Sequence, residues 1–316
     1  MMTEYAIKAR GLVKRFGELT AVDGIDLSVP AGSIYAMLGP NGAGKTTTIN
    51  MLTTLTRPTA GEARVAGHDL LRAPDKVRAK IGVTFQEIVL DRDLSGREVL
   101  DIHGRLYRQP TEQRRSRIAE LVELVQLGDA IDRRVGTYSG GMKRRLELAR
   151  GLMTDPAVLF LDEPTQGLDP QNRVGIWSYI RELNRSRGLT LLLTTHYMDE
   201  AEALASHVGI VDKGRLVAEG EPQRLVESMG ADVIRVRGQG EPGHFVQSVA
   251  ALPFVSRVEA EADGELVLVY VDSGSRRLVD ILGAASGNGF RVEDVTVARP
   301  SLGDLFLSYT GRALRD

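Results

Sequence analysis

The stretch of residues 39–47, Gly-Pro-Asn-Gly-Ala-Gly-Lys-Thr-Thr, constrains the fold more than any other part of this 316-residue chain. It fits the pattern G-x-x-x-x-G-K-[ST], in which backbone N–H groups surround phosphate oxygens. Glycines permit that close approach because they carry no Cβ. In this pattern Lys45 places a positive charge near the β- and γ-phosphates, and the Thr46 hydroxyl suits Mg²⁺. The stretch therefore predicts a nucleotide-phosphate site.

The flanks of this loop support the prediction. Residues 33–38 before it are apolar enough for a buried strand. Residues 45–55 after it predict a helix, with Ile49, Leu52 and Leu55 on one side. The N-terminus of such a helix attracts anions. A chance glycine-rich turn is the weaker interpretation, because a strand and a helix stand at the expected ends.

Two further apolar runs end in polar residues. Residues 157–161 precede Asp162 and Glu163, and residues 189–195 precede His196. Short apolar runs are typical of buried parallel strands, and α/β sheets bind ligands at the carboxyl ends of such strands. Asp162 suits Mg²⁺, and Glu163 can polarise a water toward a γ-phosphate. The equivalent position of His196 favours a contact with the same phosphate over a purely structural role.

Several residues allow two interpretations on their own. The Phe16 ring could stack on an adenine or belong to the core. Gln86 follows an apolar strand and could be a surface residue or a ligand. Ser139, followed by Gly140 and Gly141 at the start of a predicted helix, could be a simple N-cap or part of a second anion site.

Bulk properties exclude several classes of protein. The formal net charge of −2 gives no electrostatic reason to expect nucleic acid. The basic clusters at residues 114–115 and 143–145 lie on predicted helices, and we interpret them as solvated faces. The chain has no cysteine, which excludes disulfides and thiol chemistry but does not settle the compartment. It also has no membrane-length apolar run and no N-terminal signal pattern. We therefore expect a cytoplasmic chain whose membrane role, if any, needs a partner.

The chain divides into regions of different pattern. Residues 5–38 predict short strands, and residues 95–127 predict helices with one apolar face formed by Ile118, Leu121, Val122 and Val125. Residues 207–219 predict a hairpin. After Pro222 the pattern changes.

Residues 232–297 alternate as β, α, β, β, α, β, a split βαβ pattern of ferredoxin-like type. A tail helix follows with Leu302, Leu305, Phe306 and Tyr309 on one face, which suits packing or a docking surface. We expect domains at residues 1–225, with a helical part at about 87–150, and at residues 226–316.

Together, the ordered motifs over residues 5–220 resemble the ATP-binding cassette (ABC) ATPase subunits of transporters. The resemblance implies an α/β P-loop NTPase cassette with a RecA-like core, an antiparallel β subdomain and a helical subdomain, plus a small α+β C-terminal domain. Tyr138 and Met142 depart from the usual Leu and Gln of the family's signature loop. The implied residues are, for catalysis, Glu163, His196, Lys45 and Gln86; for ATP, Phe16, Gly39, Pro40, Asn41, Gly42, Ala43, Gly44, Lys45, Thr46, Thr47, Ser139, Gly140, Gly141 and Asp169; and for Mg²⁺, Thr46, Gln86 and Asp162.

Residues 137–146 and 300–307 resemble, more narrowly, the drug-exporter branch typified by daunorubicin-resistance ATPase subunits. The resemblance implies that the chain hydrolyses ATP to power export of a drug-like or lipid-like substrate through a separate integral-membrane permease. It also implies a head-to-tail dimer, with ATP between residues 39–47 of one copy and the signature loop of the other. The chain would lie on the cytoplasmic face of the membrane.

Two alternatives compete with this interpretation. A cassette ATPase without a permease, acting on ribosomes or DNA, usually carries two cassettes or long inserts, and this chain has neither. A nucleotide-gated regulatory subunit would hydrolyse ATP poorly, and the presence of both Glu163 and His196 argues against it.

Overall fold

The computed structural model describes residues 5–229, 232–261, 265–285, 290–298 and 300–310. The chain divides into two compact units, residues 1–216 and 217–316, so the division falls inside strand β10 (Arg215–Gly220). The boundary expected between residues 225 and 226 falls inside α8 (Pro222–Glu227), which packs against the C-terminal helix of the second unit. The division into functional domains at residues 1–225 and 226–316 stays a prediction.

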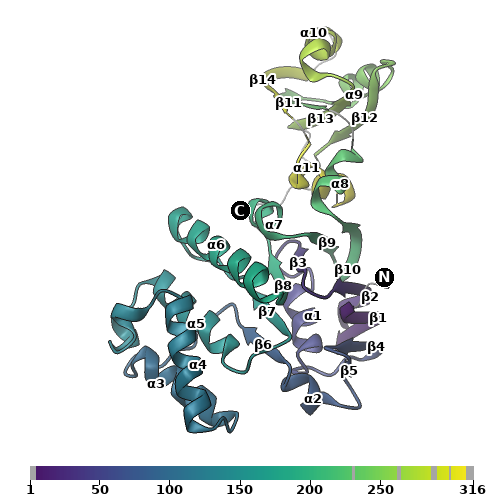
Figure 1. Ribbon diagram of the computed structural model, residues 1–316. Coiled ribbons are helices and arrows are strands. Elements are labelled where there is room, and N and C mark those ends of the chain that lie inside the picture. The colour runs from purple at the N-terminus through teal and green to yellow at the C-terminus, as the bar shows by residue number, and fades with distance from the viewer. Residues whose placement is uncertain (1–4, 230–231, 262–264, 286–289, 299, 311–316) are drawn as a thin grey trace. The chain divides into compact units, whose positions relative to one another are not determined.

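A six-stranded sheet forms the centre of the first unit, in the order β10-β9-β3-β8-β7-β6 (Figure 1). Its strands pair in parallel from β9 through β3, β8 and β7 to β6. Every residue of β3, β7 and β8 is buried, which explains why these strands are continuous apolar runs. The bounds are β3 (Ile34–Leu38), β6 (Ile81–Thr84), β7 (Val158–Asp162), β8 (Thr190–Thr195) and β9 (His207–Asp212).

An antiparallel sheet in the order β2-β1-β4-β5 shares its core with the parallel sheet. One buried cluster contains Ile7 and Leu27 from this sheet, Tyr35 and Phe160 from the parallel sheet, and Ile49 from α1. The two sheets are therefore held together through α1. The bounds are β1 (Tyr5–Phe16), β2 (Leu19–Pro30), β4 (Ala60–Val65), β5 (His68–Asp69), α1 (Lys45–Leu52) and α2 (Pro74–Arg78).

Helix α1 is shorter than the sequence predicted. It ends at Leu52, where the Thr53 hydroxyl donates to the Ile49 carbonyl at 2.8 Å. Thr54 then adopts a left-handed conformation with φ of 67°, which turns the chain out of the helix. Leu55 is 59% exposed, so its predicted place on the apolar face of α1 is wrong.

A helical part lies between β6 and β7 and agrees with the predicted insert. The predicted face of Ile118, Leu121, Val122 and Val125 is buried, as expected. Arg114 is also buried and donates to Asp101 and to the Gln109 carbonyl, so the prediction of a solvated face is wrong for this residue. The bounds are α3 (Gly96–Leu106), α4 (Thr111–Leu124), two 3-10 turns (Gly128–Ala130 and Val135–Thr137) and α5 (Gly140–Leu152).

Two more helices belong to the first unit, and a hairpin crosses the boundary between the units. Helix α6 (Pro170–Arg187) follows β7, and α7 (Met198–Leu204) follows β8. The predicted hairpin is confirmed, because β9 and β10 are neighbours and Lys213 and Gly214 both have positive φ. None of the described helices has the length and apolar character needed to cross a membrane.

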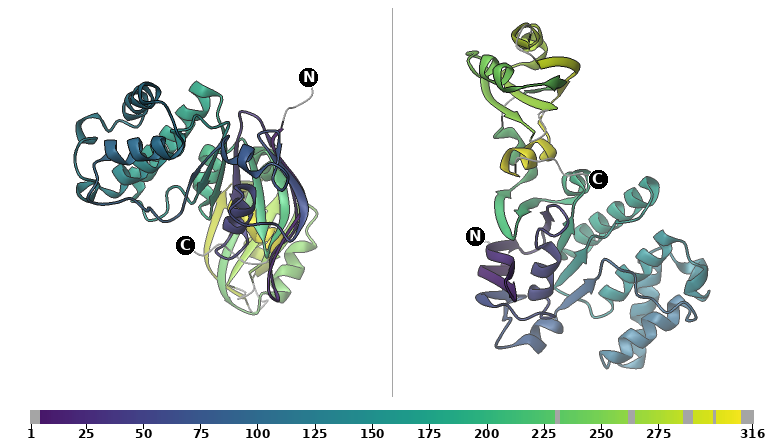
Figure 2. Two further views of the ribbon diagram at one scale, coloured as in Figure 1. Left: turned by 90° about the horizontal axis from the view of Figure 1, so that it is seen from below. Right: turned by 180° about the vertical axis from the view of Figure 1, so that it is seen from behind.

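The second unit contains a β-sheet with helices packed on it (Figure 2). The four strands of this sheet lie in the order β12-β13-β11-β14, and every neighbouring pair is antiparallel. This order and the β-α-β-β-α-β succession confirm the predicted ferredoxin-like pattern. Phe245, Val249 and Ile281 from its two helices join the strand side chains in one buried cluster. The bounds are β11 (Asp232–Gly240), α9 (Gly243–Ala250), β12 (Val255–Ala260), β13 (Leu266–Val271), α10 (Gly274–Ala285) and β14 (Phe290–Ala298).

The C-terminal helix α11 (Leu302–Thr310) packs within this second unit. Leu302, Leu305 and Phe306 are buried, and Asp304 pairs with Arg235 of β11. The packing interpretation of the tail helix is therefore confirmed for these residues. Tyr309 is 53% exposed and does not take part to the same extent.

We expect Phe306→Ala to lower the free energy of unfolding by about 3–5 kcal/mol, because it leaves a cavity where a fully buried ring packs. Tyr309→Ala should change it by less than about 0.5 kcal/mol, because that ring is largely exposed. Urea denaturation followed by circular dichroism compares the two. Equal stability of the Phe306→Ala and parent chains would contradict the packing and favour a docking surface.

Candidate functional site

The loop between β3 and α1 is held in place by contacts that only glycine permits. The Gly39 N–H donates to the Thr195 carbonyl at 3.2 Å, and a Cβ on Gly39 would lie 2.3 Å from the Val211 carbonyl oxygen. Gly44 has φ of 103°, and a Cβ there would lie 2.5 Å from the Ala21 carbonyl oxygen. The loop therefore sits at the carboxyl edge of the parallel sheet, as the sequence predicted.

Lys45, the first residue of α1, is buried at the edge of this loop. Its Nζ donates to the Gly39 carbonyl at 2.7 Å and the Pro40 carbonyl at 3.0 Å, and lies 3.5 Å from Glu163 Oε1. Burial lowers the pKa of Lys45, while the negative charge of Glu163 opposes that shift. Two of its partners are neutral carbonyls, so an anion placed in the loop would interact more strongly with this ammonium.

Asp162 joins the loop to the next strand. Its Oδ1 accepts hydrogen bonds from the Thr46 hydroxyl at 3.1 Å and from the Thr194 hydroxyl at 2.5 Å. The structure thus brings together Thr46 and Asp162, two of the predicted metal ligands. Thr194 was missed at the sequence level. Its signal is a polar residue near the end of an apolar strand, directly opposite Asp162 in the β7–β8 pairing.

Glu163 adopts an uncommon backbone conformation beside these groups. Its φ is 47°, and its N–H donates to the Thr194 hydroxyl at 3.0 Å. Its Oε2 lies 3.2 Å from His196 Nδ1, but the angles do not form a hydrogen bond. Both atoms are buried without a hydrogen-bond partner among the described residues. Buried polar atoms are normally satisfied, so this pair is suited to a water or a ligand oxygen.

Gln86 lies on the surface near this site. Its Nε2 donates to Gln166 Oε1 at 2.7 Å, and the Gln166 N–H donates to the Glu163 carbonyl at 3.2 Å. Gln86 is therefore connected to the Glu163 turn through Gln166, a residue that we did not predict. In the described part of the chain it does not hydrogen-bond to Thr46 or Asp162.

The predicted signature loop begins α5. Ser139 caps that helix, with its hydroxyl accepting from the Met142 N–H at 3.2 Å. Gly141 packs against α6, because a Cβ on it would lie 2.7 Å from Asn172 Oδ1. The N-cap interpretation of Ser139 is thus confirmed, and both Ser139 and Gly140 are exposed. No described hydrogen bond joins Ser139 or Gly140 to residues 39–47 of the same chain.

Asp169 and Phe16 also lie at exposed positions. Asp169 caps α6, and the backbone N–H of Asn172, which donates to its carboxylate at 3.0 Å, lowers the pKa of Asp169. Phe16 ends β1, is 51% exposed and has Lys14 Nζ 4.9 Å from its ring centroid. The interpretation of Phe16 as a core residue is therefore wrong, and its stacking on an adenine stays a prediction.

Arg144 corrects the interpretation of the second basic cluster. It is 2% exposed, and its guanidinium points inward from α5 to the backbone around Glu163. The prediction of a solvated face for residues 143–145 is wrong for this residue. A run of basic residues does not show which of them is buried. Only the contacts of α5 distinguish Arg144 from the basic residues on either side of it.

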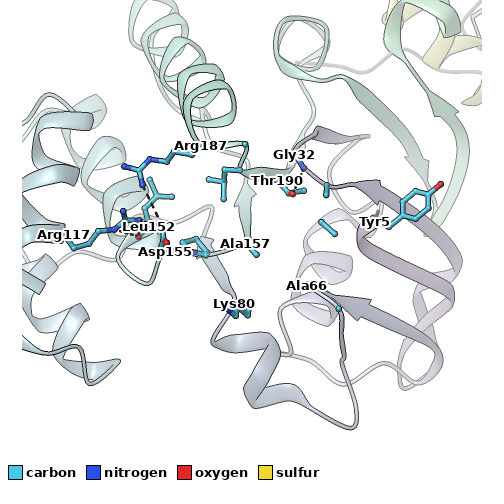
Figure 3. Close-up of a pocket in the computed structure, with 16 residues that line it drawn as sticks. Tyr5, Gly32, Ala66, Lys80, Arg117, Leu152, Asp155, Ala157, Arg187 and Thr190 are labelled. Atoms are coloured by element: carbon cyan, nitrogen blue, oxygen red, sulfur yellow. Dashed lines mark hydrogen bonds and ion pairs between the residues drawn. The ribbon is translucent and has the colours of Figure 1, made fainter. Parts of the chain in front are cut away.

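A cavity of about 530 Å³ lies at the opposite end of the parallel strands (Figure 3). Gly32, Ala157 and Thr190 line it at or near the starts of β3, β7 and β8. Parallel sheets bind ligands at the carboxyl ends of their strands, so this position does not suit a substrate. Arg117 and Asp155, which also line it, neutralise each other at 3.1 Å. None of the predicted site residues lines this cavity.

A groove of about 320 Å³ lies beside Gln86 on the first unit. Leu55, Phe85 and Tyr107 line it and are 59%, 37% and 47% exposed. His103 also lines it, and burial, with a smaller contribution from the charge of Arg150, lowers the pKa of His103 to about 4. The groove thus combines apolar side chains and a histidine that is neutral at physiological pH with Arg78 and Arg150, which also line it.

Comparisons with known proteins agree with this geometry. The family model described as ABC transporter matches residues 22–166. The chain is 44% identical over 312 residues to the daunorubicin resistance ATP-binding protein DrrA2 of Streptomyces coeruleorubidus, covering 98% of this chain and 96% of that one. It is 41% identical to the Nod factor export ATP-binding protein I of Paraburkholderia xenovorans, covering 100% of both chains.

Solved structures show the same fold. CbiO1 from Clostridium perfringens, part of the ABC transporter complex CbiONQ, aligns with a TM-score of 0.67 and 26% identity, over 71% of this chain and 91% of that one. A dimeric ATP-binding cassette in a post-hydrolysis state, bound to ADP and Pi, aligns with a TM-score of 0.61 and 26% identity. The alignment covers 68% of this chain and 98% of that one. Both similarities are to cassettes that are shorter than this chain.

We expect the free energy of unfolding to fall as the pH drops from 6.5 toward 4, in part because of His103. In the unfolded chain this histidine gains its proton near pH 6.5, whereas in the folded chain it resists protonation until about pH 4. Its contribution is complete above pH 6.5. The free energy of unfolding of His103→Gln should therefore fall less between pH 7 and 4 than that of the parent chain, as measured by urea denaturation. Parallel pH curves for the two chains would contradict the burial of this imidazole.

Proposed function

The chain belongs to the ABC transporter family, as an ATP-hydrolysing subunit of the drug-resistance and export type, and we propose here which of its residues perform that hydrolysis. Residues 39–47 hold the phosphates of ATP, with Lys45 at the β- and γ-phosphates. The support is the geometry of the loop, whose glycines allow close approach and whose buried Lys45 ammonium is bound mainly by neutral carbonyls. Phe16, exposed at the end of β1, stacks on the adenine.

We assign Mg²⁺ to Thr46 and Asp162, with Gln86 as a further ligand that must first leave Gln166. The residues fit this ion. Mg²⁺ usually takes one or two protein carboxylates and completes its shell with phosphate and water oxygens. When bound, Mg²⁺ neutralises negative charge on the phosphates.

Glu163 positions the attacking water, and His196 contacts the γ-phosphate. One observation carries this proposal: Glu163 Oε2 and His196 Nδ1 lie 3.2 Å apart, buried and without hydrogen-bond partners, beside the Lys45 ammonium. A water bound by Glu163 would lie at the carboxyl edge of the sheet, next to the phosphate loop. Catalysis of this kind depends on positioning and on electrostatic stabilisation of the transferred phosphoryl group.

A second copy of the chain completes the site. Ser139 and Gly140 expose a helix N-terminus suited to an anion, and Asp169 caps a neighbouring helix. Because these residues do not hydrogen-bond to residues 39–47 of their own chain, we assign them to the nucleotide of a partner in a head-to-tail dimer. The dimeric cassette among the structural relatives is consistent with that arrangement.

An integral-membrane permease on a separate chain is the second partner. Relatives named as ATP-binding proteins for drug resistance and for Nod factor export support such a partner. We place its contact at the groove lined by Leu55, Phe85 and Tyr107, because an exposed apolar groove next to Gln86 can transmit movement to the nucleotide site. The subunit then works at the cytoplasmic face of the membrane. Relatives named for daunorubicin resistance and Nod factor export support a drug-like or lipid-like substrate.

Glu163→Gln should keep ATP binding, accumulate an ATP-bound dimer and lower kcat about 10²–10⁴-fold, because the amide cannot accept a proton from water. Steady-state hydrolysis, titration with a fluorescent ATP analogue and light scattering measure these three properties. Glu182→Gln on α6, which is 52% exposed at its side chain, is the matched control and should behave as the parent.

The same measurements on Lys45→Ala separate binding from chemistry. This variant should lose nucleotide binding, since it lacks the ammonium that faces the phosphates. Full turnover by Glu163→Gln would remove Glu163 from its assigned role. Unchanged ATP affinity in Lys45→Ala would undo the assignment of the phosphate loop.

Leu55→Glu combined with Tyr107→Ala should abolish stoichiometric co-purification of a multi-span membrane protein from detergent extracts, while ATP binding remains. A carboxylate in the groove would have to be desolvated on docking. Val279→Glu, at a residue 77% exposed on the second unit, is the control. Retention of the membrane protein by the groove variant would move the permease contact elsewhere. Absence of any such protein from the parent would favour an ATPase that acts without a permease.

A further inference from the structure

A single buried side chain connects α5 to the backbone around Glu163. The Arg144 guanidinium donates hydrogen bonds to four backbone carbonyls, those of Phe85 at 2.8 Å, Asp162 at 3.1 Å, Glu163 at 2.9 Å and Pro164 at 2.6 Å. The donors are Nε for Pro164, Nη1 for Phe85 and Nη2 for the other two. Arg144 is 2% exposed, so these bonds are shielded from water.

The partners of Arg144 are dipoles rather than charges. In the described part of the chain no carboxylate forms an ion pair with it, and the nearby Glu147 pairs with Arg150 instead. A buried guanidinium needs its donors satisfied, and its planar fork fixes the directions of the groups that accept from it. Arg144 therefore constrains the geometry of the backbone more than it balances a charge.

The backbone that it constrains has an uncommon conformation. Glu163 has φ of 47°, in the left-handed region that residues other than glycine rarely adopt. Such conformations persist when surrounding contacts hold them. Arg144 binds the carbonyls of residues 162, 163 and 164, so it holds the peptide groups on both sides of Glu163. The Glu163 N–H donates to both the hydroxyl and the backbone carbonyl of Thr194, at 3.0 and 3.2 Å.

The fourth carbonyl extends the connection to Gln86. Phe85, whose carbonyl accepts from Arg144, directly precedes Gln86. Arg144 itself lies on α5, the helix that Ser139 caps. One side chain thus joins three parts of the site: the helix behind the signature loop, the segment that carries Gln86, and the turn that carries Glu163.

We propose that Arg144 is a positioning residue for ATP hydrolysis, which holds Glu163 in its reactive orientation and transmits the position of α5 to it. The proposal rests on the role assigned to Glu163 above. Arg144 makes no hydrogen bond with residues 39–47, so its loss should affect the chemical step and spare the binding of ATP.

The test compares full-length Arg144→Lys and Arg144→Ala with Arg145→Ala, a change of the adjacent arginine, which donates to none of the four carbonyls. We expect kcat to fall on the order of 100-fold in both Arg144 variants, the scale of effect for a small misplacement of a catalytic group. The Kd for a fluorescent ATP analogue should stay near the parental value. Methylguanidinium should restore part of the lost kcat in Arg144→Ala and should not affect Arg145→Ala.

Thermal unfolding of each variant shows whether it is folded, since Arg144→Ala leaves several buried carbonyls without donors. Should that variant not fold, Arg144→Lys decides, because it keeps the charge and loses the planar fork. A parental kcat in Arg144→Lys overturns the proposal. So does a loss of kcat matched by a loss of ATP binding, or a folded Arg144→Ala variant that does not respond to methylguanidinium.

Glu163→Gln, assayed in parallel, tests the role of Glu163 separately from the positioning role of Arg144. Full turnover in Glu163→Gln would refute the assigned role of Glu163 itself. Loss of turnover in Glu163→Gln, together with parental kcat in both Arg144 variants, would leave that role intact and refute only the positioning role of Arg144.

Discussion

The parallel pairing of β7 with β8 is the interaction on which the site depends. It places Asp162 opposite Thr194, and the Thr194 hydroxyl then contacts both the Asp162 carboxylate and the Glu163 N–H. Because β3 pairs with the other side of β8, the phosphate loop and Thr46 lie at the same edge. A shift of one residue in this register would turn Asp162 to the other face of the sheet.

Side chains of opposite charge are buried together at the carboxyl edge of the parallel sheet. Lys45, Asp162 and Glu163 are each at most 5% exposed, and each would be costly to bury alone. Lys45 shares its donors between Glu163 and neutral carbonyls, while Glu163 and His196 keep polar atoms without hydrogen bonds among the described residues. These groups form a buried charge network, in which electrostatic interactions are stronger than they would be in bulk solvent.

Some elements could be predicted because their cause is local. The phosphate loop follows from its glycines and Lys45, and the buried face of α4 follows from helical spacing. The hairpin turn at Lys213 and Gly214 and the ferredoxin-like succession of the second unit were also correct. Predictions failed where a distant contact decides. Leu55 was predicted to belong to a helix, but the left-handed conformation of Thr54 turns the chain out of that helix. Arg144 was predicted to face solvent, because the partners that bury it lie 18 to 59 residues away in the chain.

The sequence by itself determined which groups can do chemistry: a phosphate loop, two carboxylates and a histidine at strand ends, and a helix start suited to an anion. These depend on residue type and on spacing along the chain. Only the tertiary structure decided which of them meet, since Thr194 and Gln166 enter the site through strand pairing and loop contacts rather than through a motif. It also decided that one arginine of a basic run is buried, because burial depends on what packs against a helix and not on the run itself.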